Sequence, residues 1–210
     1  CLLFAREGAT VSVADYDEQG GRETVQQVQA AGGQAVFIRA DVSKSADVRN
    51  MLNTTVETYG RIDVLFNNAG IEGPSAKLAN YPEDAWERVI ATDLTSVYLG
   101  MKYVIPHMIK QGGGVILSTA SVAGLVGFPG SGAYAAAKAG VINMTRMVAL
   151  EYAKKNIRIN CICPGVISTP MAQRVIGGRP EEQVARMEPI GRLGMPEDIA
   201  NAALFLAGDE

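Results

Sequence analysis

The chain has 210 residues, of which 48% are apolar, 20% charged and 6% aromatic, with a net charge of −3. This composition predicts a globular domain with one sizeable core, and no basic stripe or long apolar run indicates nucleic acid or a membrane as partner. The single histidine, His107, excludes zinc and iron sites that need two or three histidines, and no metal site is expected. Three cysteines make no disulfide framework, which favours a reducing compartment such as the cytoplasm.

Short β-branched runs alternate with helical stretches along the chain. Strands are expected at 9–14, 35–40, 62–66, 115–118 and 158–163, and helices at 17–31, 43–59, 82–110, 133–155, 180–187 and 196–207. Pro106 is expected to kink the helix in which it lies. Nearly continuous apolar strands are typical of a parallel sheet that helices cover on both faces. The predicted fold class is therefore α/β, with residues 1–210 as a single domain.

The first residues lack one part of a doubly wound sheet. Residues 1–7 resemble the end of a helix, and a strand follows directly, whereas this fold normally places a strand and a glycine-rich turn before that helix. No G-x-G-x-x-G occurs, and the glycines at 112–114 lead into a strand, which favours a flexible loop. We therefore expect a Rossmann-like parallel sheet without its first strand and glycine-rich loop.

Tyr134 and Lys138 stand four residues apart in an alanine-rich helix, so both side chains lie on one face. A tyrosine hydroxyl is a poor base at neutral pH, but a neighbouring ammonium stabilises its phenolate. Such pairs also occur on ordinary helix surfaces, so the spacing alone decides little. A strand, Ser121 and a glycine-rich loop come directly before this helix, and that context favours the catalytic interpretation.

With these motifs the sequence resembles the short-chain dehydrogenase/reductase family over essentially its whole length. The resemblance rests on Asn67-Asn68-Ala69-Gly70, Ser121 thirteen residues before Tyr134, Tyr134-x-x-x-Lys138, and Asn160-x-x-x-Pro164-Gly165 followed by Thr169. It implies that Tyr134 is the general acid/base, that Lys138 lowers its pKa and holds the nicotinamide ribose, and that Ser121 orients the substrate oxygen. The hydride belongs to the cofactor.

The resemblance also points to residues on the adenosine side of the cofactor. Asp15 ends the first strand, where a carboxylate can accept from a ribose 2′-hydroxyl and would repel a 2′-phosphate. NAD is therefore favoured over NADP, and the next residue, Tyr16, is not an arginine. The alternative for Asp15 is a helix cap or turn. Asp41 and Val42 resemble the family's adenine-contact pair, with a turn as an equally good explanation.

Two further segments are assigned to the cofactor by the resemblance, one beside the sheet and one on the nicotinamide side: Asn68, Ala69, Gly70, Pro164, Gly165, Ile167 and Thr169. One position departs from the family pattern, because Asp93 stands where the family usually has an asparagine that supports a local helix distortion. The nearly isosteric aspartate can retain that distortion. Its charge near Lys138 would favour the ammonium and weaken the coupling to Tyr134, so we expect reduced but measurable activity.

The sequence is thus expected to be an NAD-dependent short-chain alcohol dehydrogenase/ketone reductase for a small-molecule substrate, assembled as a homotetramer or homodimer through its two long helices. Residues 71–80, 122–131 and 171–193 would wall the substrate. Two alternatives stay open: an NADPH-dependent 3-oxoacyl-carrier-protein-type reductase, and a catalytically impaired fragment. The family's last strand is expected after residue 210, and these 210 residues alone are expected to bind cofactor poorly. Cys161 and Cys163 are expected in the core rather than in a metal or redox pair.

Overall fold

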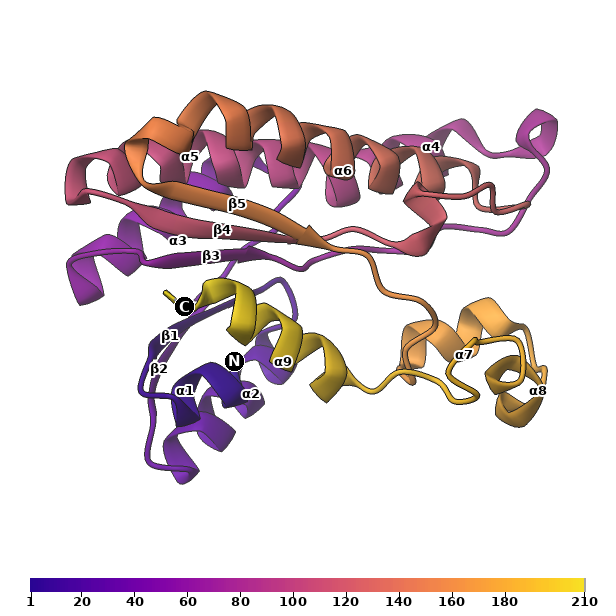
Figure 1. Cartoon of the computed structure of the whole chain (residues 1–210), viewed down its shortest axis with the longest axis horizontal. Coiled ribbons are helices and arrows are strands. Elements are labelled where there is room, and N and C mark those ends of the chain that lie inside the picture. The colour runs from indigo at the N-terminus through magenta and orange to yellow at the C-terminus, as the bar shows by residue number, and fades with distance from the viewer. Residues whose placement is uncertain (210) are drawn as a thin grey trace.

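A computed structural model describes residues 1–209 as an α/β fold with five parallel strands in two sheets (Figure 1). β1 (Thr10–Asp15) pairs with β2 (Gln34–Arg39), while β4 (Gly114–Thr119) lies between β3 (Val64–Asn67) and β5 (Ile157–Ile162). The predicted strands are confirmed to within one or two residues at each end. They form a pair and a triplet rather than one continuous sheet, because β1 and β3 do not pair in the part of the chain that is described.

Helices cover both faces of the three-stranded sheet (Figure 1). The α-helices are α1 (Leu2–Arg6), α2 (Glu18–Ala30), α3 (Ser45–Tyr59), α4 (Glu83–Ile90), α5 (Ser96–Gln111), α6 (Gly132–Tyr152), α7 (Pro170–Ile176), α8 (Glu181–Ala185) and α9 (Pro196–Ala207). Short 3-10 turns lie at η1 (Leu78–Asn80), η3 (Val122–Gly124) and η4 (Ala153–Lys155). α5 and α6 pack on one face of the triplet and α9 on the other, while α1 and α2 pack beside β1 and β2. No helix within residues 1–209 is long and apolar enough to cross a bilayer.

The alternation of side chains along β4 explains this layering. Ile116 faces the main core, which lies between the sheet and the helices α3, α5 and α6. Its neighbours Val115 and Leu117 point to the opposite face, where they pack with Ala203 of α9. Both faces are therefore apolar, and the carboxyl ends of β3, β4 and β5 meet at one edge (Figure 1).

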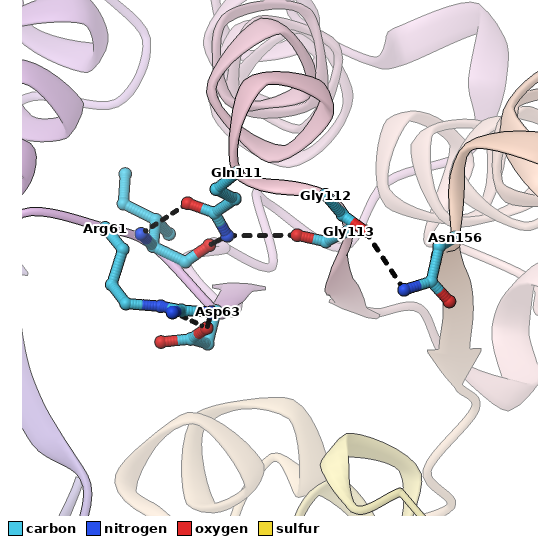
Figure 2. A network of polar contacts seen from close by, with 7 residues as sticks. Arg61, Asp63, Gln111, Gly112, Gly113 and Asn156 are labelled. Carbon is cyan, nitrogen blue, oxygen red and sulfur yellow. Dashed lines mark hydrogen bonds and ion pairs between the residues drawn. The ribbon is translucent and has the colours of Figure 1, made fainter.

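Polar contacts tie together the amino ends of β3 and β4 at the end of α5 (Figure 2). The Gln111 side chain accepts from Ile62 N at 3.1 Å, and it donates to Ile62 O at 2.7 Å and to Gly113 O at 3.0 Å. Asn156 Nδ2 donates to Gly112 O at 3.1 Å. Gly112 ends α5 with a left-handed φ of 95°, a conformation that favours glycine. The glycine cluster at 112–114 therefore ends a helix and starts a strand.

The helical stretch predicted at 82–110 contains an irregularity that the sequence pattern did not place. Five residues, Ala91–Thr95, form a π-helix between α4 and α5, and Asp93 lies at their centre. Pro106 lies inside α5. The local helix distortion that the resemblance implied at Asp93 is thus present with aspartate in place of asparagine. Single π turns of this kind often occur at functional sites.

α7 was not predicted. It begins at Pro170, and the hydroxyl of Thr169 accepts from Ala172 N at 3.2 Å to cap it. A threonine cap followed by proline at the first helical position is a recognised helix start. The adjacent prediction of a helix at 180–187 is confirmed in shorter form as α8.

Candidate active site

Ser121, Tyr134 and Lys138 come together at the carboxyl ends of β4 and β5. Lys138 Nζ lies 5.4 Å from the centre of the Tyr134 ring, one helical turn away on α6, and it donates to Thr119 O at 2.9 Å. Ser121 follows β4, and its buried hydroxyl accepts from Ala123 N at 3.2 Å. The Ser121 side chain lies close enough to Tyr134 to lower the pKa of its hydroxyl. The three predicted catalytic side chains therefore form one cluster.

Asp93 forms an ion pair with Lys138, the charged member of this cluster. The Asp93 side chain is fully buried and only 3% of Lys138 is exposed. Asp93 Oδ2 lies 3.2 Å from Lys138 Nζ, in ion-pair contact without hydrogen-bond geometry, and Asp93 Oδ1 accepts from Ile71 N at 2.8 Å. A Cβ on Gly70 would lie 2.9 Å from Asp93 Oδ2 and 3.2 Å from Lys138 Nζ. Glycine at position 70 therefore leaves room for the buried pair.

Burial raises the pKa of Tyr134. The nearby Ser121 hydroxyl lowers this pKa, while the carboxylates of Asp93 and Glu72 raise it further. The net direction is opposite to the lowering expected from Lys138. Burial is the largest cause of this difference, and the Asp93 carboxylate beside Lys138 adds to it. Burial also raises the pKa of Asp93 itself, and the charge of Lys138 opposes that effect.

Asp15 and Asp41 lie at the carboxyl ends of β1 and β2. Ala40 N donates to Asp15 O at 2.9 Å, so the two strand ends are adjacent. Asp15 Oδ1 accepts from Asp17 N at 2.9 Å, and Asp41 Oδ1 accepts from Ser43 N at 3.0 Å and from Ser43 Oγ at 2.6 Å. The Ser43 hydroxyl lowers the pKa of Asp41. Each carboxylate therefore stabilises the turn in which it lies.

The segment after β3 that the resemblance assigns to the cofactor is joined to β4. Asn68 Oδ1 accepts from Thr119 Oγ1 at 2.8 Å, beside the Thr119 carbonyl that holds Lys138. Asn68 and Ala69 are exposed at this edge, whereas Gly70 is half-buried against the ion pair. Val42, from the other predicted pair, is partly buried against the main core.

The segment after β5 that the resemblance also assigns to the cofactor connects the cluster of Ser121, Tyr134 and Lys138 to α7. Pro164 O accepts from Val122 N at 3.0 Å, next to Ser121. Gly165 lies close to Glu188, and Ile167 forms an isolated parallel bridge with Gly194. The Thr169 hydroxyl caps α7. These residues form one continuous path from the end of β5 to α7.

The full chain, residues 1–210, matches the family model described as enoyl-(acyl carrier protein) reductase. The chain belongs to the short-chain dehydrogenase/reductase family. Cyclohexanol dehydrogenase of Acinetobacter sp. (strain SE19) is 38% identical over 100% of this chain and 82% of its own length. The 3-oxoacyl-[acyl-carrier-protein] reductase FabG of Thermotoga maritima is 41% identical over 100% of this chain and 84% of its own length. The crystal structure of NAD+-bound xylitol dehydrogenase superposes with a TM-score of 0.94 at 31% identity, over 99% of this chain and 86% of that chain.

Membership of the short-chain dehydrogenase/reductase family makes the chain an oxidoreductase whose relatives act on small-molecule alcohols and ketones with a nicotinamide cofactor. Within residues 1–209, no three His, Cys, Asp or Glu side chains are grouped to hold a metal ion. Cys161 and Cys163 are free and partly buried against the main core, as expected.

In this dehydrogenase/reductase, sequence reasoning missed an ion pair beside the catalytic cluster. Arg174 of α7 forms a salt bridge with Glu72, in the loop after β3, and this bridge lowers the pKa of Glu72. Glu72 also raises the pKa of Tyr134, so its carboxylate acts on the catalytic hydroxyl. The two partners are 102 residues apart, and no local spacing signals such a pair.

Proposed function

We propose that the protein is an NAD-dependent secondary-alcohol dehydrogenase/ketone reductase. The observation that carries this proposal is the convergence of Ser121, Tyr134 and Lys138 at the carboxyl ends of β4 and β5. A hydroxyl that can gain or lose a proton beside a second hydroxyl donor is what alcohol/ketone interconversion requires. Bound NAD supplies hydride acceptance in one direction, and NADH supplies hydride donation in the other.

The residues at this edge match the chemical groups of a dinucleotide. Lys138 carries three donor protons, and Thr119 O and the Asp93 carboxylate engage its ammonium from one side. A remaining proton is available to a ribose hydroxyl. At the carboxyl end of β1, in the separate two-stranded sheet, Asp15 is exposed where a carboxylate can accept from ribose hydroxyls. The two sites thus supply a donor and an acceptor, and the carboxylate favours NAD over NADP.

In the oxidative direction, Tyr134 Oη accepts the proton of the substrate hydroxyl while Ser121 Oγ holds the substrate oxygen. In the reductive direction, the same tyrosine returns the proton to that oxygen. The step requires phenolate to form, and Asp93 makes this harder because its carboxylate raises the pKa of Tyr134. We therefore propose that turnover is measurable but slower than the Ser121–Tyr134–Lys138 cluster alone would give.

A second candidate is an NADPH-dependent 3-oxoacyl-carrier-protein-type reductase. The family model and the relative from Thermotoga maritima support it, while the carboxylate of Asp15 argues against a 2′-phosphate. The third candidate, a catalytically impaired relative, rests on the Asp93–Lys138 ion pair. NADPH preference with a 3-oxoacyl thioester would favour the second candidate, and NADH binding without turnover would favour the third.

We also propose a homotetramer or homodimer in the cytoplasm. Large apolar side chains are exposed on the two long helices that the family resemblance assigns to assembly: Tyr98, Ile109, Met147 and Leu150. Such residues on a helix surface favour contact with another subunit. The three cysteines are free, which suits a reducing compartment. Sedimentation of the protein at several concentrations tests the assembly.

The decisive experiment combines cofactor binding with one substitution. NADH titration of the full-length protein, followed by NADH fluorescence, should show saturable binding that is tighter than binding of NADPH. Tyr134→Phe should retain NADH binding while kcat for alcohol oxidation falls roughly 10²- to 10⁴-fold, because only the proton acceptor is lost. Absence of NADH binding, or unchanged turnover in Tyr134→Phe, would overturn the proposed function.

A further inference from the structure

Large apolar side chains are exposed in the loop that connects Ser121 to Tyr134. Leu125 is 56% exposed, Val126 55% and Phe128 46%. Apolar residues scattered singly on a surface need no explanation, but a group of them at the mouth of a site often marks what the site binds. This loop begins and ends at catalytic side chains, so its apolar residues lie within a short stretch of chain from the reacting atoms.

Two other segments that flank the cluster also expose large apolar side chains. The loop after β3 exposes Leu78, and the segment that contains α7 and α8 exposes Val175, Met187 and Ile190. Figure 1 places α7 and α8 at the end of the molecule toward which β5 points. All three segments expected to wall the substrate therefore expose large apolar side chains.

Contacts between these segments bring them around the same site. Ala76 N donates to Gly130 O at 3.1 Å, so the loop after β3 pairs with the loop before Tyr134. Leu78 Cδ1 lies 3.5 Å from the position of a Cβ on Gly132, at the start of α6. The salt bridge between Glu72 and Arg174 then joins the loop after β3 to α7. The three walls are thus connected to one another.

The charged side chains of the three segments lie outside the loop between Ser121 and Tyr134. The loop at 122–131 contains no charged residue, whereas the two outer segments expose Lys77, Arg179 and Arg186. Glu72 and Arg174 are paired with each other. Against the hydrocarbon of this loop a polyol would leave many hydroxyls without hydrogen-bond partners, and an anionic group would find no partner there.

We infer that the substrate is a secondary alcohol or ketone with a predominantly hydrocarbon body, held by Leu125, Val126 and Phe128. This inference rests on the proposed function, because it specifies what the Ser121–Tyr134 site accepts. The relative that oxidises cyclohexanol belongs to the same substrate class. The relatives named for xylitol and for 3-oxoacyl carrier protein represent the polyol and anionic alternatives.

The test compares kcat/KM for cyclohexanol with NAD, xylitol with NAD, and reduction of acetoacetyl-coenzyme A with NADH and NADPH. Cyclohexanol is expected to give the highest value, by about tenfold or more. Leu125→Ser and Phe128→Ser should each lower kcat/KM for cyclohexanol about tenfold through KM, and they should lower kcat/KM for 2-propanol by less because its small body contacts less of the wall. Phe205→Ser is the matched control, since Phe205 is an exposed apolar residue on α9.

The outcomes separate this inference from the proposed function. Turnover of xylitol or acetoacetyl-coenzyme A in preference to cyclohexanol would overturn the inference and leave an active oxidoreductase. Equal losses for cyclohexanol and 2-propanol in the wall variants would also overturn it. A change in oligomeric mass without a change in selectivity would overturn it too, and would assign Leu125 and Phe128 to a subunit contact. Saturable NADH binding without turnover of any of these compounds would overturn both proposals.

Discussion

The catalytic cluster and the adenosine-side turns are built differently, although both lie at the carboxyl ends of parallel strands. In the catalytic cluster Lys138 and Asp93 are buried, and their charged groups are bonded to each other or to backbone. On the adenosine side, Asp15 and Asp41 are exposed and bond only to their own turns. Changes in the buried cluster should therefore affect activity and stability together. Changes at the exposed turns should affect cofactor binding alone.

Lys138→Met should have the largest effect. It removes the cation beside Tyr134 and leaves the Asp93 carboxylate buried without its partner. We expect kcat/KM to fall roughly 10²- to 10⁴-fold and the free energy of unfolding to fall by about 3–5 kcal/mol, because an uncompensated buried charge is costly. Steady-state kinetics and urea unfolding measure the two effects.

The double variant Lys138→Met with Asp93→Asn separates the effect on activity from the effect on stability. Replacing the carboxylate by a neutral amide removes the uncompensated charge, so most of the lost stability should return while activity stays low. If the double variant were as unstable as Lys138→Met alone, the ion pair would not be the origin of the destabilisation.

Asp15→Ala should have a smaller effect that is confined to the cofactor. We expect KM for NAD to rise about tenfold, which corresponds to about 1.4 kcal/mol of binding, and the preference for NAD over NADP to narrow as the repulsion of a 2′-phosphate disappears. The Asp15 side chain is exposed, so the urea midpoint should change little. Kinetics with both cofactors measure the effect.

Asp17→Ala is the matched control for Asp15→Ala. Asp17 is also an exposed carboxylate, two residues further on, and it caps α2 by accepting from Gln19 N at 3.1 Å. Its loss should cost about 1 kcal/mol of stability and leave the ratio of NAD to NADP kinetics unchanged. Equal changes in cofactor preference for both variants would show that the Asp15 carboxylate does not select the cofactor.

The sequence was sufficient to predict that Ser121, Tyr134 and Lys138 lie together, because the determinants of that arrangement are local. Tyr134 and Lys138 share one helix face through their spacing, and Ser121 follows the neighbouring strand. The same holds for the strands, whose apolar runs predict them to within one or two residues. Thr169 and Pro170 carried a local signal for α7 as well.

Other features depend on contacts between distant parts of the chain, so local patterns could not reveal them. Glu72 and Arg174 meet across 102 residues. At the π-helix, the Asp93 carboxylate is held by Ile71 N and Lys138, from two other segments. The raised pKa of Tyr134 likewise depends on the burial and the carboxylates that these contacts create.

Asp93→Asn should have the smallest effect on rate, seen mainly in the pH profile of alcohol oxidation. Asp93 raises the pKa of Tyr134, so removing its charge should lower that pKa and allow the phenolate to form at lower pH. The rising limb of kcat/KM should therefore move toward lower pH, and turnover near neutral pH should increase. Asparagine can still accept from Ile71 N, which keeps the π-helix in place.

Glu72→Gln provides the comparison that shows whether the effect belongs to the buried pair. Glu72 also raises the pKa of Tyr134, but its contribution is smaller than that of Asp93 and Arg174 partly neutralises it. The rising limb of the pH profile of Glu72→Gln should therefore also move toward lower pH, but by a smaller amount. An unchanged limb in Asp93→Asn, or a larger shift in Glu72→Gln, would show that the buried ion pair does not control the proton affinity of Tyr134. A larger shift in Asp93→Asn than in Glu72→Gln would instead show that aspartate at position 93 lowers the rate electrostatically, while the geometry of the catalytic cluster stays intact.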